Sequence, residues 1–387
     1  MPDVQPSYLV NLRMNIEGVD IDFVKPVKYK FTDPVRGELY QPLVVIPPVL
    51  VTPTEDLKIV ISDNEKEQGS ILLKGMKKDF SGKLTVLSAT NKLPIDKFSF
   101  SIPEFKVATK NQALDIIYNG VTGKESIEAL FAVNSAGSKE TIGTDKHEIT
   151  YDHIPNINYF HDASVIFRYI DLKTYGKKIG YIVGAGDKVP AALEQMGYEV
   201  TLLGNKELSR NNLQQFDAIL SGVRAYNTNE WMSNYYDKLM KYVEQGGNLI
   251  VQYNTNNFLS GVRAKMGPYP FTINRNRITD EKATVNILNP DHPAFNFPNK
   301  INQDDFKGWI QERSIYHASD TTGKFEKLIS MNDPGEKADD GSLLVAKYGK
   351  GYFTYTGLVF FRELPAGVPG AYRLLANLIA LNRKKAF

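Results

Sequence analysis

The chain has 387 residues, with 46 Lys and Arg side chains against 44 Asp and Glu, which gives a formal net charge of +2. This length exceeds one typical domain of about 100 to 200 residues, so we expect more than one domain. The balanced charge, without a basic stripe, argues against nucleic-acid binding, and no apolar run approaches the ~20 residues that span a bilayer.

Cysteine is absent from the chain. Its absence excludes disulfides, thiolate catalysis and cysteine-ligated zinc, whatever the compartment. Residues 1–3 lead into strand-like sequence without the basic start and apolar core of a signal peptide. We therefore expect any export signal to have been removed or never to have been present.

The first 153 residues predict β structure, because short runs of alternating apolar and polar residues recur between turn residues without a helical period. Pro47 and Pro48 mark a stiff extended connection, which places a boundary near residue 50. We expect a β segment over residues 1–50, too short for a complete sandwich, and an immunoglobulin-like β-sandwich over residues 51–153. The expected strands of that sandwich are 57–61, 70–73, 84–87, 114–118, 127–133 and 147–151.

From residue 154 onward the pattern changes to alternating strands and helices. Residues 178–183 predict a strand buried on both faces, followed by a tight turn at Gly184 and Gly186 and a helix that Asp187 caps. This alternation predicts a flavodoxin-like, mainly parallel sheet covered by helices over residues 154–387. The further elements expected are strands at 199–203, 216–222 and 249–253, a helix at 230–245, a hairpin at 343–348 and 352–356, and a helix near 371–381.

Polar loops follow the predicted parallel strands. Ligands of open parallel sheets bind beyond the carboxyl ends of the strands, and amides, tyrosines and an arginine suit a sugar or a peptide, with the arginine available for a carboxylate. The same residues can serve only to close loops, and Trp309 is equally well explained as an aromatic anchored over a core edge. The candidate ligand-binding residues are Gly184, Gly186, Asp187, Arg224, Tyr226, Asn227, Gln252, Tyr253, Asn254, Trp309, Glu312 and Arg313.

Other site chemistries have weaker support. The turn at Gly184 and Gly186 lacks the third glycine and the later acidic residue of a dinucleotide site, so no cofactor is expected. Ser221 lies at a strand end, where Glu312 and His317 would have to orient and deprotonate it, but no Gly-x-Ser-x-Gly elbow exposes its hydroxyl. No two histidines have the spacing of a helical zinc site, so a metal centre is not expected.

Several segments carry a resemblance to known families. Residues 178–257 resemble the fold of class I glutamine amidotransferases, and Tyr253 or Asn254 in the run GGNLIVQYN (246–254) stands where those enzymes carry their nucleophilic cysteine. The runs FKGWIQER (306–313) and GLVFFRELP (357–365) resemble the C-terminal region of large bacterial PIG-L/LmbE-type deacetylases. The run YKFTDPVRGE (29–38), with Pro47, Pro48 and Val49, resembles the β-domains that precede that region.

In that family the deacetylase activity belongs to an N-terminal zinc domain with a His-Pro-Asp-Asp-Glu-type run, which this chain lacks; residues 291–293 have similar letters in the wrong order. The resemblance therefore implies a non-catalytic accessory portion of a larger N-acetylsugar deacetylase, in the periplasm or outside the cell. A glycan or an adjoining deacetylase domain would be its partner. An autonomous hydrolase with a non-cysteine site in the α/β cleft is the alternative, and a purely structural spacer is a third hypothesis.

Overall fold

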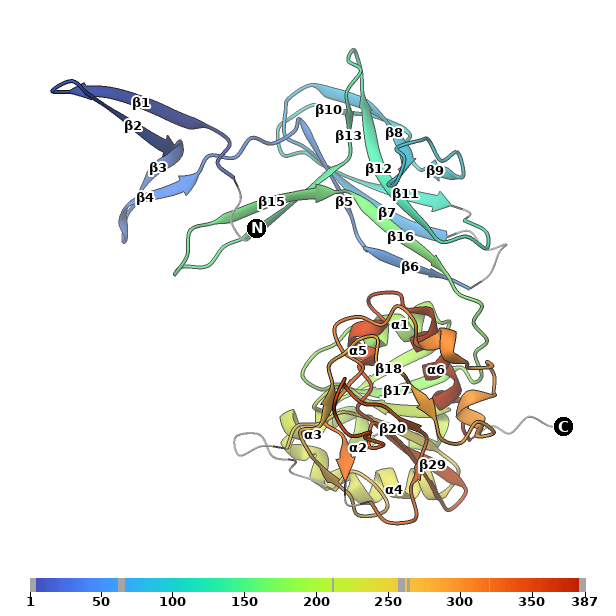
Figure 1. Cartoon of the computed structure of the whole chain (residues 1–387). Helices are drawn as coiled ribbons and strands as arrows, with labels where there is room; N and C mark the ends of the chain where they lie inside the picture. The colour runs from blue at the N-terminus through green and yellow to red at the C-terminus, as the bar shows by residue number, and fades with distance from the viewer. Residues whose placement is uncertain are drawn as a thin grey trace. The chain divides into compact units, whose positions relative to one another are not determined.

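The structure is a computed structural model that describes residues 5–61, 67–120, 122–210, 212–256, 262, 265–319 and 321–382 (Figure 1). Residues 1–3 and residue 257, on which two expectations above depend, lie outside those ranges. The chain divides into two compact units, Met1–Tyr169 and Ile170–Phe387. Among the described residues the first unit contains strands and no helix, the second unit combines strands with helices, and no helix is long and apolar enough to cross a membrane.

The first unit contains an immunoglobulin-like β-sandwich, as the alternating patterns predicted. Its core lies between two sheets, where Tyr118, Phe131 and Phe167 are fully buried and contact one another. One sheet has the order β10 (Glu104–Val107), β8 (Phe80–Ser88), β12 (Ile127–Ser135), β16 (Ser164–Tyr169) and β6 (Leu57–Val60), with β13 (Thr141–Ile142) paired to β12. The other has the order β5 (Val49–Pro53), β7 (Glu67–Gly75), β11 (Ala113–Gly120) and β9 (Phe98–Phe100).

Three two-stranded ribbons complete this unit. They are β1 (Leu9–Ile16) with β2 (Val19–Pro26), β3 (Lys28–Asp33) with β4 (Gly37–Pro42), and β14 (Thr144–Ile149) with β15 (Ile157–Asp162). The first two ribbons are largely exposed, and Val49 is the first fully buried residue. The expected boundary after residue 153 differs from the structure, because β15 pairs with β14 and β16 joins β12 and β6 in the sandwich. The second unit therefore begins at Ile170.

The second unit contains a seven-stranded sheet. Its order is β18 (Glu199–Leu203), β17 (Lys178–Ile182), β19 (Ala218–Ser221), β20 (Asn248–Gln252), β29 (Gly351–Thr356), β28 (Leu343–Tyr348) and β26 (Glu326–Lys327). The first five strands are parallel, β28 is antiparallel to β29, and β26 is antiparallel to β28. The chain goes from β17 to β18 on one side of β17 and then to β19 on its other side. The direction in which successive strands are added to the sheet therefore reverses between β17 and β19. Ligand sites of such sheets occur at this reversal.

Helices cover the two faces of this sheet. Leu249 and Val251 share a core with Leu239 and Val243 of α4, while Asn248, which points to the other face, donates to the last carbonyls of α6. The expected helix at 230–245 begins as a 3-10 turn, Glu230–Tyr235, before α4. The helices are α1 (Val189–Gln195), α2 (Asn205–Arg210), α3 (Ala225–Thr228), α4 (Tyr236–Glu244), α5 (Phe360–Glu363) and α6 (Pro369–Ile379).

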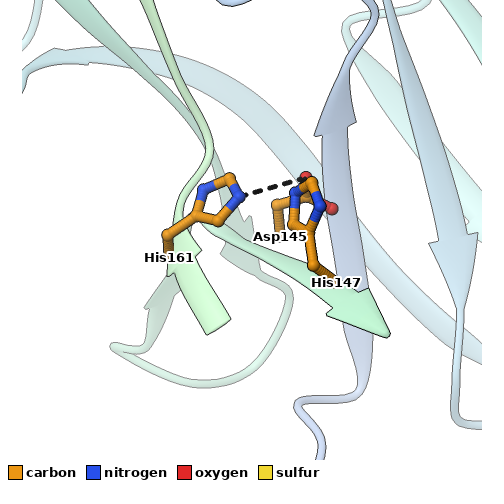
Figure 2. A group of neighbouring side chains, drawn as sticks. All are labelled: Asp145, His147 and His161. Carbon is orange, nitrogen blue, oxygen red and sulfur yellow. Dashed lines mark hydrogen bonds and ion pairs between the residues drawn. The ribbon is translucent and has the colours of Figure 1, made fainter. Parts of the chain in front are cut away.

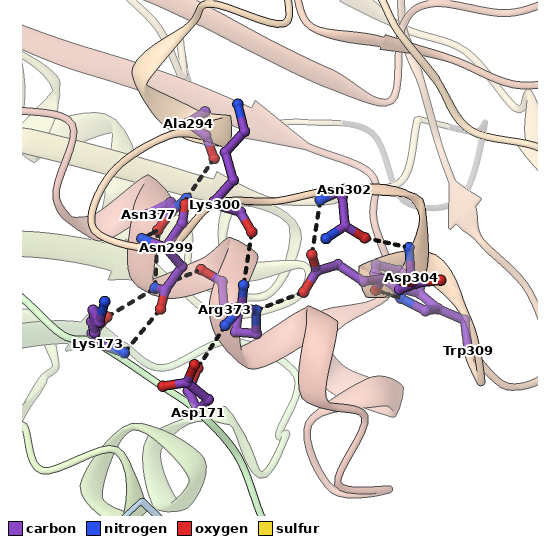
Figure 3. A network of polar contacts seen from close by, with 11 residues as sticks. Asp171, Lys173, Ala294, Asn299, Lys300, Asn302, Asp304, Trp309, Arg373 and Asn377 are labelled. Carbon is purple, nitrogen blue, oxygen red and sulfur yellow. Dashed lines mark hydrogen bonds and ion pairs between the residues drawn. The ribbon is translucent and has the colours of Figure 1, made fainter.

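A long segment between β20 and β28 is tied to α6 by a polar network (Figure 3). Arg373 donates to Asp305 Oδ1 at 2.7 Å and to the carbonyls of Asp171 and Lys300 at 2.6 and 2.7 Å. Asn377 Nδ2 donates to the carbonyl of Asn299 at 2.7 Å. The short elements of this segment are β21 (Thr272–Ile273), β22 (Arg277–Ile278), β23 (Asn286–Ile287), β24 (Ser314–Ile315), β25 (Ala318–Ser319) and β27 (Ile329–Ser330), with 3-10 turns at Pro293–Phe295 and Gln303–Phe306.

Candidate functional site

Asp187 connects two loops at the carboxyl ends of β17 and β19. Its carboxylate accepts hydrogen bonds from the hydroxyl of Tyr181 at 2.6 Å, from the N–H of Val189 at 3.0 Å and from the N–H of Val223 at 3.2 Å. The bond from Val189 satisfies a free N–H at the start of α1, although the N-cap residue is Lys188 and not, as the sequence predicted, Asp187. Gln252 Nε2 in turn donates to Tyr181 at 3.1 Å. Asp187 and Gln252 therefore fix the relative positions of three strand ends.

The two glycines after β17 are required by backbone geometry. A Cβ on Gly184 would lie 2.2 Å from the carbonyl oxygen of Val223, and Ala185 N–H donates to that carbonyl at 2.8 Å. Gly186 has a φ of 97°, which residues with a Cβ rarely adopt. These positions allow the loop after β17 to approach the loop after β19 closely.

Tyr226, Asn227 and Asn254 close the neighbouring loops. Asn254 Oδ1 accepts from the N–H of Tyr226 at 2.9 Å, and the Asn227 side chain exchanges two 2.8 Å hydrogen bonds with the backbone of Thr255. All three side chains are buried. The side-chain amides of Asn227 and Asn254 thus satisfy backbone groups, which is the structural role that the sequence left open for these residues.

Tyr253 lies at the centre of a half-exposed aromatic and charged group. Its ring stacks on Tyr316, with centroids 5.6 Å apart and planes 10° apart, and its centroid is 5.3 Å from that of Phe361. Burial raises the pKa of the Tyr253 hydroxyl, while the charges of Arg224 and Arg362 lower it. We define the Tyr253 cluster as Tyr253, Tyr316, Phe361, Arg224, Arg362 and Glu312.

The two arginines of the Tyr253 cluster differ in their partners. Arg362 Nε donates to Glu312 Oε1 at 3.1 Å, its guanidinium also bonds Gln311, and it lies 5.0 Å from the centre of the Phe361 ring. Arg224 Nε is buried and has no hydrogen-bond partner within the described part of the chain. A buried donor without a partner is costly, so Arg224 is the cation of this cluster with capacity for a ligand or water.

Backbone strain is concentrated around the same cluster. Arg224, Gln311 and Tyr316 have φ values of 59°, 66° and 54°, and they are the non-glycine residues with positive φ among the described residues of the second unit. Such a conformation costs of order 1 kcal/mol or more for a residue with a Cβ, and it is frequent at functional sites. Here it is held by the hydrogen bonds from Arg224 N–H to Tyr253 O at 2.9 Å and from Tyr355 to Tyr316 O at 2.7 Å.

Trp309 and Arg313 form a separate, buried pair. The indole N–H of Trp309 donates to the carbonyl of Asp305 at 3.0 Å, and only 3% of Trp309 is exposed. Arg313 lies over the Trp309 ring at 5.7 Å and donates from Nε to the carbonyl of Ala283 at 3.2 Å, while burial lowers its pKa. Trp309 therefore has the core-edge position that the sequence left open.

The serine and histidine expected to act together do not meet. Ser221 is fully buried, and its Oγ has no partner among the described residues. His317 instead approaches Ser314 Oγ through Nε2 at 2.7 Å and Asp339 Oδ1 through Nδ1 at 2.5 Å. Glu312, the other expected partner, bonds Arg362.

The Ser314, His317 and Asp339 side chains have the connectivity of a serine-hydrolase triad. Burial alone would raise the pKa of Asp339, but hydrogen bonds from His317, from the Asn276 amide and from Gly341 N–H outweigh it and hold this pKa well below its usual range. Ser314 and His317 are both 0% exposed, so the hydroxyl is closed to a substrate in this structure. No elbow motif surrounds Ser314, so this triad could not be predicted from the sequence.

Comparisons with known proteins place the chain in no family. No family model matches it, and no curated protein sequence matches it. Solved structures share parts of it at low similarity, including a β-galactosidase from Rahnella sp. R3, with 15% identity over 52% of this chain and 30% of that chain and a TM-score of 0.32. The present chain thus spans about a third of that enzyme.

Two other solved structures each match about a third of this chain. A Salmonella enterica SafA pilin in complex with the SafB chaperone has 14% identity over 34% of this chain and 59% of that chain, with a TM-score of 0.22. The PapD-like domain of human CEP192 has 10% identity over 34% of this chain and 92% of that chain, with a TM-score of 0.21. Similarity at this level carries no argument about function.

Proposed function

We propose that this chain is a non-catalytic, carbohydrate-binding portion of a larger PIG-L/LmbE-type deacetylase, with a flavodoxin-like, amidotransferase-like second unit. The observation that carries the binding role is the Tyr253 cluster, where an aromatic stack lies beside Arg224, whose Nε has no hydrogen-bond partner among the described residues. The order of the parallel strands and the position of the cluster at their carboxyl ends support the amidotransferase-like assignment.

The ligand that fits this cluster is a sugar with a carboxylate. Tyr253, Tyr316 and Phe361 are each half-buried and offer ring surface to the apolar face of a sugar, as aromatic side chains do in ligand sites. Arg224 can take a carboxylate with its planar guanidinium, whereas Arg362 is already bonded to Glu312. Recognition would therefore depend mainly on Tyr253 and Arg224.

A binding role rather than catalysis is supported by how the neighbouring polar side chains are used. Asp187, Gln252 and Asn254 hydrogen-bond strand ends and loops, and none of them forms a nucleophile and base pair with another. These bonds keep the strand ends in place without a reactive group. A preorganised surface of this kind lowers the entropic cost of ligand binding.

Titration calorimetry with uronate-containing and neutral oligosaccharides tests the binding role. We expect the uronate ligands to bind and Arg224→Ala or Tyr253→Ala to weaken them at least tenfold. Arg275→Ala and Tyr175→Ala, which remove exposed side chains outside the cluster, serve as matched controls. Equal affinity of the Arg224→Ala, Tyr253→Ala and unaltered proteins would remove the proposed site.

The accessory role and the location are tested in the source cells. We expect immunoblotting to detect a product heavier than the 43.5 kDa of this chain, in the periplasmic or secreted fraction. A product of that mass confined to the cytoplasm would contradict both proposals. A structural spacer, in contrast, predicts that no oligosaccharide binds at all.

A second candidate function is an autonomous hydrolase, and the Ser314, His317 and Asp339 geometry favours it over the Ser221 arrangement. Full burial of Ser314 means that substrate access requires the surrounding segments to move. Covalent labelling by a fluorophosphonate probe, lost in Ser314→Ala, would support the hydrolase. Absence of labelling, with Ser314→Ala less stable than the unaltered chain, would assign the three residues a structural role.

A further inference from the structure

Asp145, His147 and His161 lie together on the β14–β15 ribbon of the first unit (Figure 2). In the antiparallel register Asp145 is directly opposite His161, and His147 is opposite Tyr159. Residues two apart on a strand share a face, and residues directly opposite one another share a face, so all three side chains project to the same side. Their ligand atoms all lie within 4.8 Å of one another.

The distances in this group suit a metal ion. Asp145 Oδ2 is 3.0 Å from His147 Nε2 and 3.8 Å from His161 Nε2. Two ligands at the usual 2.0–2.2 Å from a tetrahedral zinc ion are about 3.4 Å apart, which lies between these two distances. Small side-chain rotations would therefore bring both nitrogens and the oxygen into one coordination sphere.

Two of the three ligands are oriented by a contact outside the group. His161 Nδ1 is 2.9 Å from the carbonyl oxygen of Asp162, which can only accept, so Nδ1 carries the hydrogen and the neutral ring presents the Nε2 lone pair to Asp145. Asp145 Oδ1 accepts from Thr52 Oγ at 2.5 Å and from the N–H of Lys146 at 2.8 Å, which leaves Oδ2 for the imidazoles. Bonds of this kind orient the ligands of protein metal sites.

The electrostatics of the group call for a cation between its members. A lone pair on Nε2 that faces a carboxylate oxygen is repulsive unless a proton or a metal ion lies between them. Only 5% of the Asp145 side chain is exposed, whereas 45% of His147 and 43% of His161 are exposed. The carboxylate is thus held in the protein, and an ion can reach the imidazoles from solvent.

We propose that Asp145, His147 and His161 bind a first-row divalent transition-metal ion of the zinc type. Two imidazoles and one carboxylate are the donors that such ions take, and hard ions such as Mg²⁺ and Ca²⁺ prefer all-oxygen ligands. The bound ion holds β14 to β15 and, through the hydrogen bond between Asp145 and Thr52, holds the ribbon to β5. This site is independent of the Tyr253 cluster, which belongs to the other unit.

Titration of the chelator-treated full chain with Zn²⁺ and with Co²⁺ tests the site. We expect one ion per chain, the visible absorption of Co²⁺ bound by nitrogen and oxygen, and no competition from Mg²⁺. His147→Gln and His161→Gln should each weaken binding at least tenfold. The control is His153→Gln, because His153 is exposed and lies outside the group.

A loss of metal binding can be distinguished from a loss of folding in these variants. Circular dichroism of each metal-free variant establishes that it is folded before titration. Binding of Zn²⁺ weaker than about 1 mM by the unaltered chain, or equal binding by the chain that carries both substitutions, would overturn the proposal. In that case the cluster is held only by the hydrogen bond between Asp145 and His147.

Discussion

Glu363 provides a test of the structure that is independent of any ligand. Its side chain on α5 is fully buried, and both carboxylate oxygens lie 3.1–3.2 Å from the N–H of Ile310. Burial raises the pKa of Glu363 to about 7, although the bond from Ile310 and the charges of Arg313 and Arg362 act in the opposite direction. The neutral, protonated carboxyl is therefore the form that the folded chain favours below about pH 7.

The sign and size of the effect on stability follow from linkage. Because the folded pKa of Glu363 exceeds its unfolded value, its contribution is fully present below the unfolded pKa of about 4.5 and is lost as the pH rises through about 7. Each tenfold change in protonation is worth about 1.36 kcal/mol, so ionisation costs about 3 kcal/mol in total. Glu363→Gln keeps a hydrogen-bond acceptor and removes the charge. We expect it to be more stable than the unaltered chain by an amount that grows by roughly 2.5 kcal/mol between pH 5 and pH 8.

Tryptophan fluorescence during urea denaturation measures this difference in the second unit alone, because both tryptophans of the chain, Trp231 and Trp309, belong to it. Glu336→Gln, which neutralises an exposed glutamate, is the control and should show the pH dependence of the unaltered chain. If Glu363→Gln kept that same pH dependence, the buried carboxyl would have to be ionised at little cost. The reasoning from burial would then be refuted.

Two further predictions concern the packing of α6 and the Tyr253 cluster. A Cβ on Gly370 would lie 1.7 Å from the carbonyl oxygen of Asp305, so Gly370→Ala must displace α6. We expect the same denaturation to show a free energy of unfolding lower by about 3 kcal/mol. Gly323→Ala is the control and should be neutral, because a Cβ at that position meets no atom within 4 Å. Tyr316→Gly relieves the left-handed backbone but removes the ring that stacks on Tyr253. We expect calorimetry to show at least tenfold weaker uronate binding, with the free energy of unfolding changed by less than about 1 kcal/mol. A large loss of stability would instead indicate that Tyr316 has a packing role.

Most strands of the main sheet in the second unit were predictable because they are buried on both faces, whereas β18 at the end of the sheet is mostly exposed. The runs at 199–203 and 343–348 have the bounds expected from the sequence, β17 ends one residue earlier than expected, and β20 is shifted by one residue at both ends. Apolar runs of that length between turn residues leave few alternatives. The boundary between the units was placed too early, because the change of pattern after residue 153 coincides with a loop inside the β14–β15 ribbon and not with a domain linker.

The candidate site was predictable only where topology determines it. Parallel strands place Arg224 and Tyr253 at one edge of the sheet, and the structure puts their backbones in contact. Tyr316 and Arg362 come from segments without a clear period, so nothing in the sequence placed them beside Tyr253. Histidine spacing was judged by a helical criterion, which overlooks His147 and His161 because the pairing register of a two-stranded ribbon brings them together.

The buried polar groups at the carboxyl ends of the parallel strands have a structural explanation. Buried amides and carboxylates destabilise a protein unless they are hydrogen-bonded, and Asp187, Gln252 and Asn254 each have partners on neighbouring strands or loops. These bonds do not involve the side chain of Tyr253, so they hold this edge of the sheet in place independently of it. Tyr253 follows β20 at this edge and stacks on Tyr316, so the edge presents aromatic ring surface. This ring surface is what the proposed binding role uses.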